Sequence, residues 1–435
     1  MRTLTRPLYT VWWIAGVTAL AACAGQTPTP TPDAPELVTA VVTPPTATAT
    51  LTPTATFTPL PPLTATPTPT PTYDPGEAGP PYEMGNLAFA EADYLEAVDE
   101  YTKAVRLRPD FADAYYNRGL AHTFLDNTEE ALEDFAQAIE LEPFRADALV
   151  ARARVYRDAG NVQATLRDLE QAITNDPEYV AAYLNRGQIF EEERQDLASA
   201  LADYDAVVGL APENPEGFLR RGRIKLALGD AEGALIDLSL AVELFPESRE
   251  AHFERGRAYS ALGQHSQAAT DFEQAIQYGL ETSEAFRNLG LAYYQIGELE
   301  SAGGSMIKAV ELDPESFAAH YSLAFVYNGI GEYYLAVLSA GDALAIDPAS
   351  PAALTLRGNA WINLEEFEEA LDDFETAFEL DPDYTPAILG IAQAYDGLGQ
   401  FDPAIAALEL FMDKATPDDP NYQDATELLD ALTPG

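Results

Sequence analysis

The chain has 435 residues, of which 71 are acidic and 24 basic, and its formal net charge is −47. This charge argues against a sequence-independent hold on nucleic-acid phosphates or anionic membrane surfaces. A single cysteine is present, which excludes an intrachain disulfide and a thiolate metal cluster. The 32 prolines are too many to be spread evenly through a helical protein, and they are concentrated in particular places.

Residues 1–22 are typical of a secretory signal peptide. Arg2 and Arg6 precede an uncharged stretch from Leu8 to Ala22 that ends in small residues. This stretch is shorter than the roughly 20 residues needed to cross a bilayer as a helix, so a permanent membrane span is the weaker interpretation.

The next residue is the single cysteine, Cys23. The run Leu20-Ala21-Ala22-Cys23 resembles the lipobox of bacterial lipoproteins. That resemblance implies cleavage before Cys23 and diacylglycerol on its sulfur, and two acyl chains give the stable anchor that one chain cannot. We therefore expect an extracytoplasmic protein, lipid-anchored to the outer side of a bacterial membrane. The alternative is an ordinary signal peptide whose cysteine has no such role.

Residues 23–77 form a Thr/Pro-rich segment that predicts a disordered tether. From Gln26 to Pro75, 17 threonines and 14 prolines make up 31 of 50 residues. Proline removes amide donors and threonine offers little to bury, so extended polyproline-like conformations are expected. The same composition resembles O-glycosylated stalks, and the sequence favours a simple spacer over a stalk without deciding between them.

A repeat of 34 residues begins after Gly76. Prolines recur at this interval, with one 35-residue step caused by an insertion near Gln195 and with Leu280 where one proline is missing. Counted in repeat units, the eighth place is always Gly or Ala, and the twentieth and twenty-seventh places are Ala in nine and eight of the ten units. The recurring prolines are Pro109, Pro143, Pro177, Pro212, Pro246, Pro314, Pro348 and Pro382.

These columns, with aromatic places such as Tyr115, Tyr293 and Phe374, resemble the tetratricopeptide repeat (TPR). Each unit predicts two amphipathic helices whose small residues allow close packing, so the expected fold is all-α, a right-handed solenoid of about ten helix pairs. Residues 420–435 are expected to form a capping helix and tail. The ten units expected within 78–419 are 78–111, 112–145, 146–179, 180–214, 215–248, 249–282, 283–316, 317–350, 351–384 and 385–419.

The sequence predicts neither an enzyme nor a cofactor or metal site. The four histidines, three of them in core columns, lack metal-ligand spacing, and no phosphate loop, nucleophile elbow or calcium loop is present. The acidic runs are interpreted as solvated helix faces.

A binding groove is implied by the resemblance, because the first helix of each TPR unit lines the concave face through its second, fifth, ninth and twelfth residues. In the middle of the array these places hold several arginines beside aromatic and apolar residues, a combination that suits a peptide. A second arginine column, directly before the small eighth residue, is expected to pair with neighbouring acids. The candidate groove residues are Arg154, Arg157, Arg223, Arg257, Arg287, Leu219, Phe253, Tyr294, Tyr321, Phe325 and Asn359.

Two functions remain open. The first is a membrane-tethered scaffold, its array monomeric, that holds a protein or peptide partner in its groove during envelope or surface-complex assembly. The second is a receptor for an anionic glycan or cell-wall polymer. For the groove arginines themselves, intramolecular pairing with Glu191, Glu250 or Glu284 is the alternative to ligand binding.

Overall fold

The computed structural model describes residues 77–433. The predicted signal peptide, Cys23 and the Thr/Pro-rich tether up to residue 76 lie outside these residues. Within them, 21 α-helices are present and no strand. None of the helices in this part of the chain is both long and apolar enough to span a bilayer.

Twenty of the helices form ten consecutive pairs, each with its two helices packed side by side. The first helices are α2 (Gly79–Ala90), α4 (Ala112–Phe124), α6 (Ala146–Asp158), α8 (Val180–Glu192), α10 (Pro215–Ala227), α12 (Arg249–Ala261), α14 (Ser283–Gln295), α16 (Phe317–Gly329), α18 (Pro351–Asn363) and α20 (Thr385–Gly397). The second helices are α3 (Tyr94–Leu107), α5 (Thr128–Leu141), α7 (Val162–Asn175), α9 (Leu197–Leu210), α11 (Ala231–Leu244), α13 (His265–Gln277), α15 (Leu299–Leu312), α17 (Tyr333–Ile346), α19 (Phe367–Leu380) and α21 (Phe401–Lys414).

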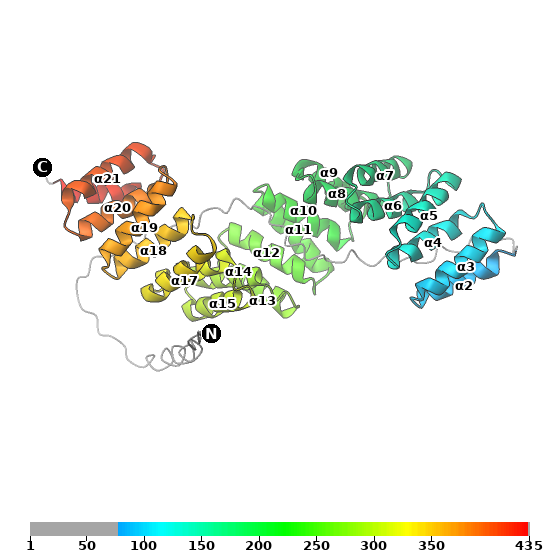
Figure 1. The fold of residues 1–435 in the computed structure, drawn as a ribbon, viewed down its shortest axis with the longest axis horizontal. Helices are drawn as coiled ribbons and strands as arrows, with labels where there is room; N and C mark the ends of the chain where they lie inside the picture. Colours follow the sequence, from blue (N-terminus) through cyan, green and yellow to red (C-terminus); the bar gives the residue numbers. More distant parts are fainter. Residues whose placement is uncertain (1–76, 434–435) are drawn as a thin grey trace, which may run out of the picture.

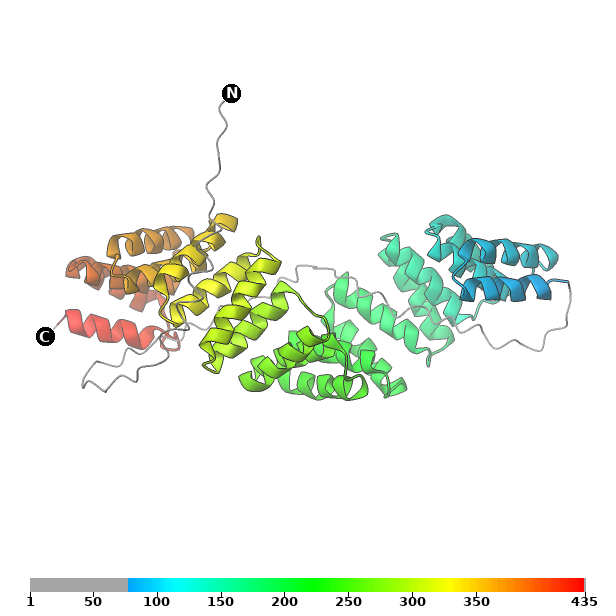
Figure 2. The same cartoon turned by 90° about the horizontal axis from the view of Figure 1, so that it is seen from below.

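The pairs follow one another in a single coiled row. The pair α2–α3 lies at one end, and α20, α21 and the final helix α22 (Tyr422–Leu432) lie at the other (Figure 1). The perpendicular view shows the same row turning along its length (Figure 2). Each pair packs on the next one, so the predicted all-α solenoid is confirmed.

The eighth place is small because the second helix places a large side chain directly against it. A Cβ on Gly256 would lie 2.7 Å from Cε1 of Phe272, and one on Gly358 would lie 2.7 Å from Cε1 of Phe374. In the three units with alanine at the eighth place, the second-helix residue is not aromatic, as in Ala153 with Leu169, although a leucine also lies opposite glycine in Gly222 with Leu238. The small residues at the eighth place therefore leave room for a side chain of the second helix, and not only for a close approach of the two backbones.

The second arginine column forms the expected ion pairs. On each of α4, α6, α8, α10, α12 and α18, the arginine of this column binds, through Nε and Nη2, both carboxylate oxygens of a buried aspartate on the second helix of its own pair. The Nε to Oδ2 distances range from 2.7 Å in Arg152–Asp168 to 2.9 Å in Arg186–Asp203. The remaining pairs are Arg118–Asp134, Arg221–Asp237, Arg255–Asp271 and Arg357–Asp373.

The turn between the two helices of a pair requires a left-handed residue. Glycine supplies it in most pairs, for example Gly263 with φ 70°. Four turns use other residues, Ala92, Asp126, Gln195 and Glu365, with φ between 53° and 62°. The extra residue of the 35-residue unit lies in such a turn, because α8 ends at Glu192 and α9 begins at Leu197.

The helix α22 covers the last pair. Ala425 is fully buried in a cluster with Leu408 and Phe411 of α21, and Leu428, Leu429 and Leu432 pack against it. Its acidic residues Glu427 and Asp430 are exposed, and Asp424 is half-buried. This helix gives the end of the array a polar surface, as solenoids require.

Candidate partner-binding groove

The first helices form the inner face of the solenoid. Most of them pack against the first helices of the neighbouring pairs as well as against their own partners, for example α14 on α16 and α16 on α18. The second helices pack instead on the first helix of their own pair and on the first helix of the next pair. The inner face therefore presents one surface of each first helix to a ligand running along the array.

All eleven predicted groove residues lie on first helices. Ten of them are half-buried, so they are partly open to solvent. Phe253 differs, because its ring is only 9 % exposed and packs against Phe272 with ring centroids 5.6 Å apart. The structure therefore places Phe253 in the core and leaves the other ten at the surface.

Three of the five groove arginines have carboxylate partners. Arg223 bonds to Glu191, which also accepts a hydrogen bond of 2.8 Å from the Tyr204 hydroxyl. Arg257 bonds to Glu254 at 2.8 Å, on its own helix. Arg157 reaches the adjacent exposed Asp158 at 3.1 Å.

Of the three acids that were expected to pair with groove arginines, only one does so. Glu191 pairs with Arg223 as expected, whereas Glu250 pairs with Arg249 at 2.8 Å. Among the residues described, Glu284 makes no ion pair. Two groove arginines therefore make no ion pair with an acid in the described part of the chain.

Arg154 and Arg287 are those arginines. Arg154 donates a hydrogen bond of 3.2 Å from Nε to Oδ1 of Asn185 and makes no ion pair within residues 77–433. Arg287 makes neither a hydrogen bond nor an ion pair there. Burial, followed by the charge of Arg157, lowers the pKa of Arg154. Burial also lowers the pKa of Arg287, and this effect is opposed by the charge of Glu284 and reinforced by that of Arg257.

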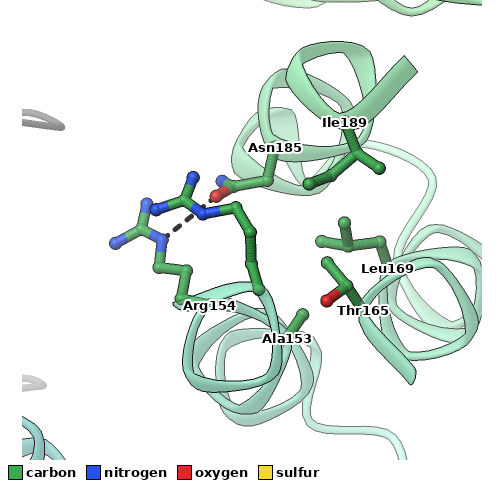
Figure 3. Close-up of a pocket in the computed structure, with 7 residues that line it drawn as sticks. Ala153, Arg154, Thr165, Leu169, Asn185 and Ile189 are labelled. Carbon is green, nitrogen blue, oxygen red and sulfur yellow. Dashed lines mark hydrogen bonds between the residues drawn. The ribbon is translucent and has the colours of Figure 1, made fainter. Parts of the chain in front are cut away.

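A shallow hollow lies beside Arg154, at the junction of α6, α7 and α8. Figure 3 shows Arg154 and Asn185 at its open side, with Ala153, Leu169 and Ile189 forming the apolar wall behind them. Arg157 and Thr165 complete the lining. The hollow therefore combines two guanidinium groups, one amide and an apolar base.

Comparison with known proteins identifies the repeat. Models of the tetratricopeptide repeat match residues 85–123, 112–144, 150–215, 253–316 and 364–429, together more than half of the chain. The chain belongs to the tetratricopeptide-repeat family. TPR proteins are generally non-catalytic scaffolds for protein interactions. A search of curated proteins finds no match.

Solved structures similar to this TPR array share little sequence with it. A tetratricopeptide repeat protein from Parabacteroides merdae ATCC 43184 is 18 % identical, covers 58 % of this chain and 98 % of its own, and has a TM-score of 0.47. The APC/C hetero-tetramer Cut9–Hcn1 is 13 % identical over 82 % of this chain and 96 % of the other, with a TM-score of 0.46. YrrB, described as a TPR protein with an unusual peptide-binding site, is 21 % identical over 42 % and 95 %, with a TM-score of 0.38.

Beyond Arg287 the groove of the TPR array changes character. Tyr294 and Phe325 meet edge to face with centroids 5.5 Å apart, and Tyr321 stacks on Phe317 at 5.8 Å. Burial raises the pKa of Tyr321 to about 12, so its hydroxyl remains protonated at neutral pH. Asn359 follows on α18, and the groove places of α16 and α18 hold no charged residue. This part of the groove is aromatic and neutral.

Asn185 is the site residue that the sequence prediction did not include. It is 4 % exposed, accepts from Arg154, and donates from Nδ2 to the Ala181 carbonyl at 2.6 Å. A signal was present, because asparagine recurs at this sixth place in Asn117 and Asn288. In the first of these, Nδ2 also bonds to the preceding first helix, at 3.0 Å from Oδ1 of Asn86.

Proposed function

We propose that this protein is a membrane-tethered TPR scaffold that binds a protein or peptide partner along the inner face of its array, in the assembly of an envelope or surface complex. The observation that carries the proposal is the inner face itself, where half-buried arginine, aromatic and asparagine side chains line successive first helices. Such side chains make strong, orienting contacts to peptides.

The tether and the location belong to the same proposal. The lipobox-like run ending at Cys23 supports a lipid anchor, and the Thr/Pro-rich segment supports a spacer that holds the array away from the membrane. Replacing Cys23 with Ser tests this part. The expected result is release of the protein from the membrane fraction, and an unchanged distribution would contradict the lipid anchor.

Partner binding is tested by crosslinking in intact cells that express the native, full chain. We expect wild type to crosslink specifically to a surface or envelope protein, and an array that captures no protein would contradict the scaffold. A combined Arg154→Gln, Arg157→Gln, Arg223→Gln and Arg257→Gln variant, shown by melting to be folded, is expected to lose that partner. Retained capture would move the contact to the Tyr321, Phe325 and Asn359 end of the groove.

A second candidate, binding of an anionic glycan or cell-wall polymer, is favoured by the cluster of arginines in the groove. Salt distinguishes the two candidates in part, because polyanion binding weakens steeply with ionic strength, whereas an aromatic-anchored peptide loses less affinity. A ligand whose affinity collapses between low and physiological salt, and which contains no protein, would support the glycan receptor.

A further inference from the structure

The first helix pair exposes a face that is buried in every later pair. The third and tenth residues of the nine later units are all buried, and Ile224, at a tenth place, packs on Ala200 and Tyr204 of the preceding second helix. In the first unit the same places hold Pro80 and Leu87, which are both exposed, Leu87 at 65 %. No helix precedes α2 among residues 77–433, so this face lacks the neighbour that covers it elsewhere.

Met84 extends this exposed face along α2. It is 50 % exposed, and it lies four positions after Pro80 and three before Leu87, so the three side chains share one stripe of the helix. In two later units the corresponding seventh place is leucine, Leu289 and Leu323, and both are buried in clusters with the preceding second helix. We call Pro80, Met84 and Leu87 the end face.

The two ends of the array therefore differ. At the far end α22 packs on α21 and covers the last pair, whereas no helix of the described residues covers the end face of α2 (Figure 1). An apolar end of a solenoid is unfavourable in water and needs a cover. The open question is what supplies it at the α2 end.

The chain before α2 contains side chains that match the end face. Phe57, Leu60 and Leu63 occur at intervals of three residues within the Thr/Pro-rich segment. The polyproline helix expected for this composition has three residues per turn and rises about 3.1 Å per residue, so these three side chains would share one side of it. They would extend over about 19 Å, close to the length of about 18 Å of the 12-residue helix α2.

From this match we propose that residues 57–63 pack lengthwise on the end face and form the N-terminal cap of the array. Residues 64–76 can span at most about 40 Å, which is enough for the chain to double back along α2. Because the cap and the face belong to one chain, the effective concentration of the cap is high. The cap does not depend on what the groove binds, and it leaves residues 24–56 as the spacer to the proposed lipid anchor.

Charge favours this occupant over a second copy of the chain. Residues 37–73 contain no charged side chain, so they add no repulsion at this end. Two copies meeting at their α2 ends would each bring a net charge of −47 and would place like charges close together, which is unfavourable. The exposed acids of the first pair are Glu83, Glu91, Glu96 and Asp99.

Oxidation of Met84 by hydrogen peroxide tests the cap. The full chain is treated in a detergent-free extract of the cells that express it, and methionine sulfoxide is measured by mass spectrometry. In a combined Phe57→Ser, Leu60→Ser and Leu63→Ser variant, Met84 should be oxidised about tenfold faster than in wild type, since burying one aliphatic side chain contributes about this factor. Met306 is fully buried and reports that the array stays folded.

The matched control removes three apolar side chains that lack the three-residue spacing. Leu37→Ser, Val41→Ser and Val42→Ser together should leave Met84 oxidised at the wild-type rate. Equal rates in wild type and the Phe57–Leu63 variant would overturn the cap. Protection of Met84 that persists in that variant and is lost on dilution would assign the end face to a second copy or another protein, and would overturn it as well.

Disulfide formation tests the contact directly and leaves the matching side chains intact. In a Cys23→Ser background, Thr58→Cys with Glu83→Cys is compared with Thr43→Cys with Glu83→Cys. A chain that does not dock would close both loops at rates within about twofold of each other, because loop-closure entropy grows slowly with length. We expect the Thr58 variant to close about tenfold faster, within one chain, and rates within about twofold would overturn the cap.

Discussion

Two groups of helix pairs have the same backbone arrangement but differ in the charge of the residues that join their two helices. The first group is the four pairs from α6–α7 to α12–α13, and the second is the next two pairs, α14–α15 and α16–α17. Each of the first four joins its helices by an arginine bound to a buried aspartate. In the next two, the same places hold Leu289 with Ser305 and Leu323 with Ser339. Arginine and aspartate are thus present together or absent together.

This difference shows that the ion pair is not needed to form the helix hairpin. The aspartates are 1–3 % exposed in the first group, so each would be a buried, uncompensated charge without its arginine. The leucine and serine pairs avoid that cost without a charge. The requirement is therefore a matched pair of residues, and either kind of pair is compatible with the fold.

The largest effect is expected from breaking one matched pair. Arg152→Leu leaves Asp168 buried without its partner and should lower the free energy of unfolding by about 3–5 kcal/mol. Adding Asp168→Ser, which copies α14–α15, should recover most of the loss. Urea unfolding followed by circular dichroism measures both variants, and a double variant as unstable as the single one would contradict the matched-pair explanation.

A smaller effect is expected at the eighth place. Gly256→Ala puts a Cβ 2.7 Å from the Phe272 ring and should cost about 1–3 kcal/mol through overpacking. Combining it with Phe272→Leu copies Ala153 and Leu169 of the α6–α7 pair, so the double variant should be more stable than the sum of the single changes. Additive losses in thermal melts would contradict this coupling, and the surface change Glu366→Gln, within about 0.5 kcal/mol, serves as control.

Substitutions of the groove arginines should differ in their effect on the free energy of unfolding. Arg223→Gln removes a partner of the buried Glu191 and should cost about 1–3 kcal/mol. Arg154→Gln removes a cation that has no ion pair, and should change the free energy of unfolding by no more than about 0.5 kcal/mol. Denaturant titration of both variants measures the difference, and equal losses would mean that Arg154 has a structural role.

The smallest effect concerns pH. Burial opposes ionisation of Asp271, but hydrogen bonds from Arg255 and His252 outweigh it and lower the pKa of the carboxyl below its ordinary 3.8. Because the folded pKa is depressed, this stabilisation is present above pH 3.8 and is lost as the pH falls through the folded value. The stability difference between wild type and Asp271→Asn should therefore shrink in acid, and a constant difference down to the folded pKa would contradict it.

The sequence was sufficient to predict the fold because its columns reflect contacts that recur in every unit. The small eighth place, the prolines after the second helices and the arginines before the eighth place each repeat a contact within one hairpin. Four left-handed turns without glycine, at Ala92, Asp126, Gln195 and Glu365, were not predicted, since helix packing there overrides backbone preference.

The groove was predicted less well because its contacts connect neighbouring units. Arg154 meets Asn185 across two first helices, and Arg223 meets Glu191 in the same way. Which side chains meet between two neighbouring first helices depends on how one hairpin is rotated against the next. This rotation cannot be read from the repeating columns of the sequence. Phe253, at a groove place by count, is instead turned into the core of its own hairpin, against Phe272.

The turn after α8 has one residue more than the other turns, yet Arg186 and Asp203, now 17 rather than 16 positions apart, bond with the same geometry as in the neighbouring pairs. The added residue is absorbed in the turn, where Gln195 is left-handed, and neither helix changes its phase. The turn at the tip of the hairpin can therefore gain or lose residues without changing the order of the side chains along the inner face. A reporter peptide inserted within the turn, between Glu193 and Asp196, should be accommodated, because this turn already contains one extra residue.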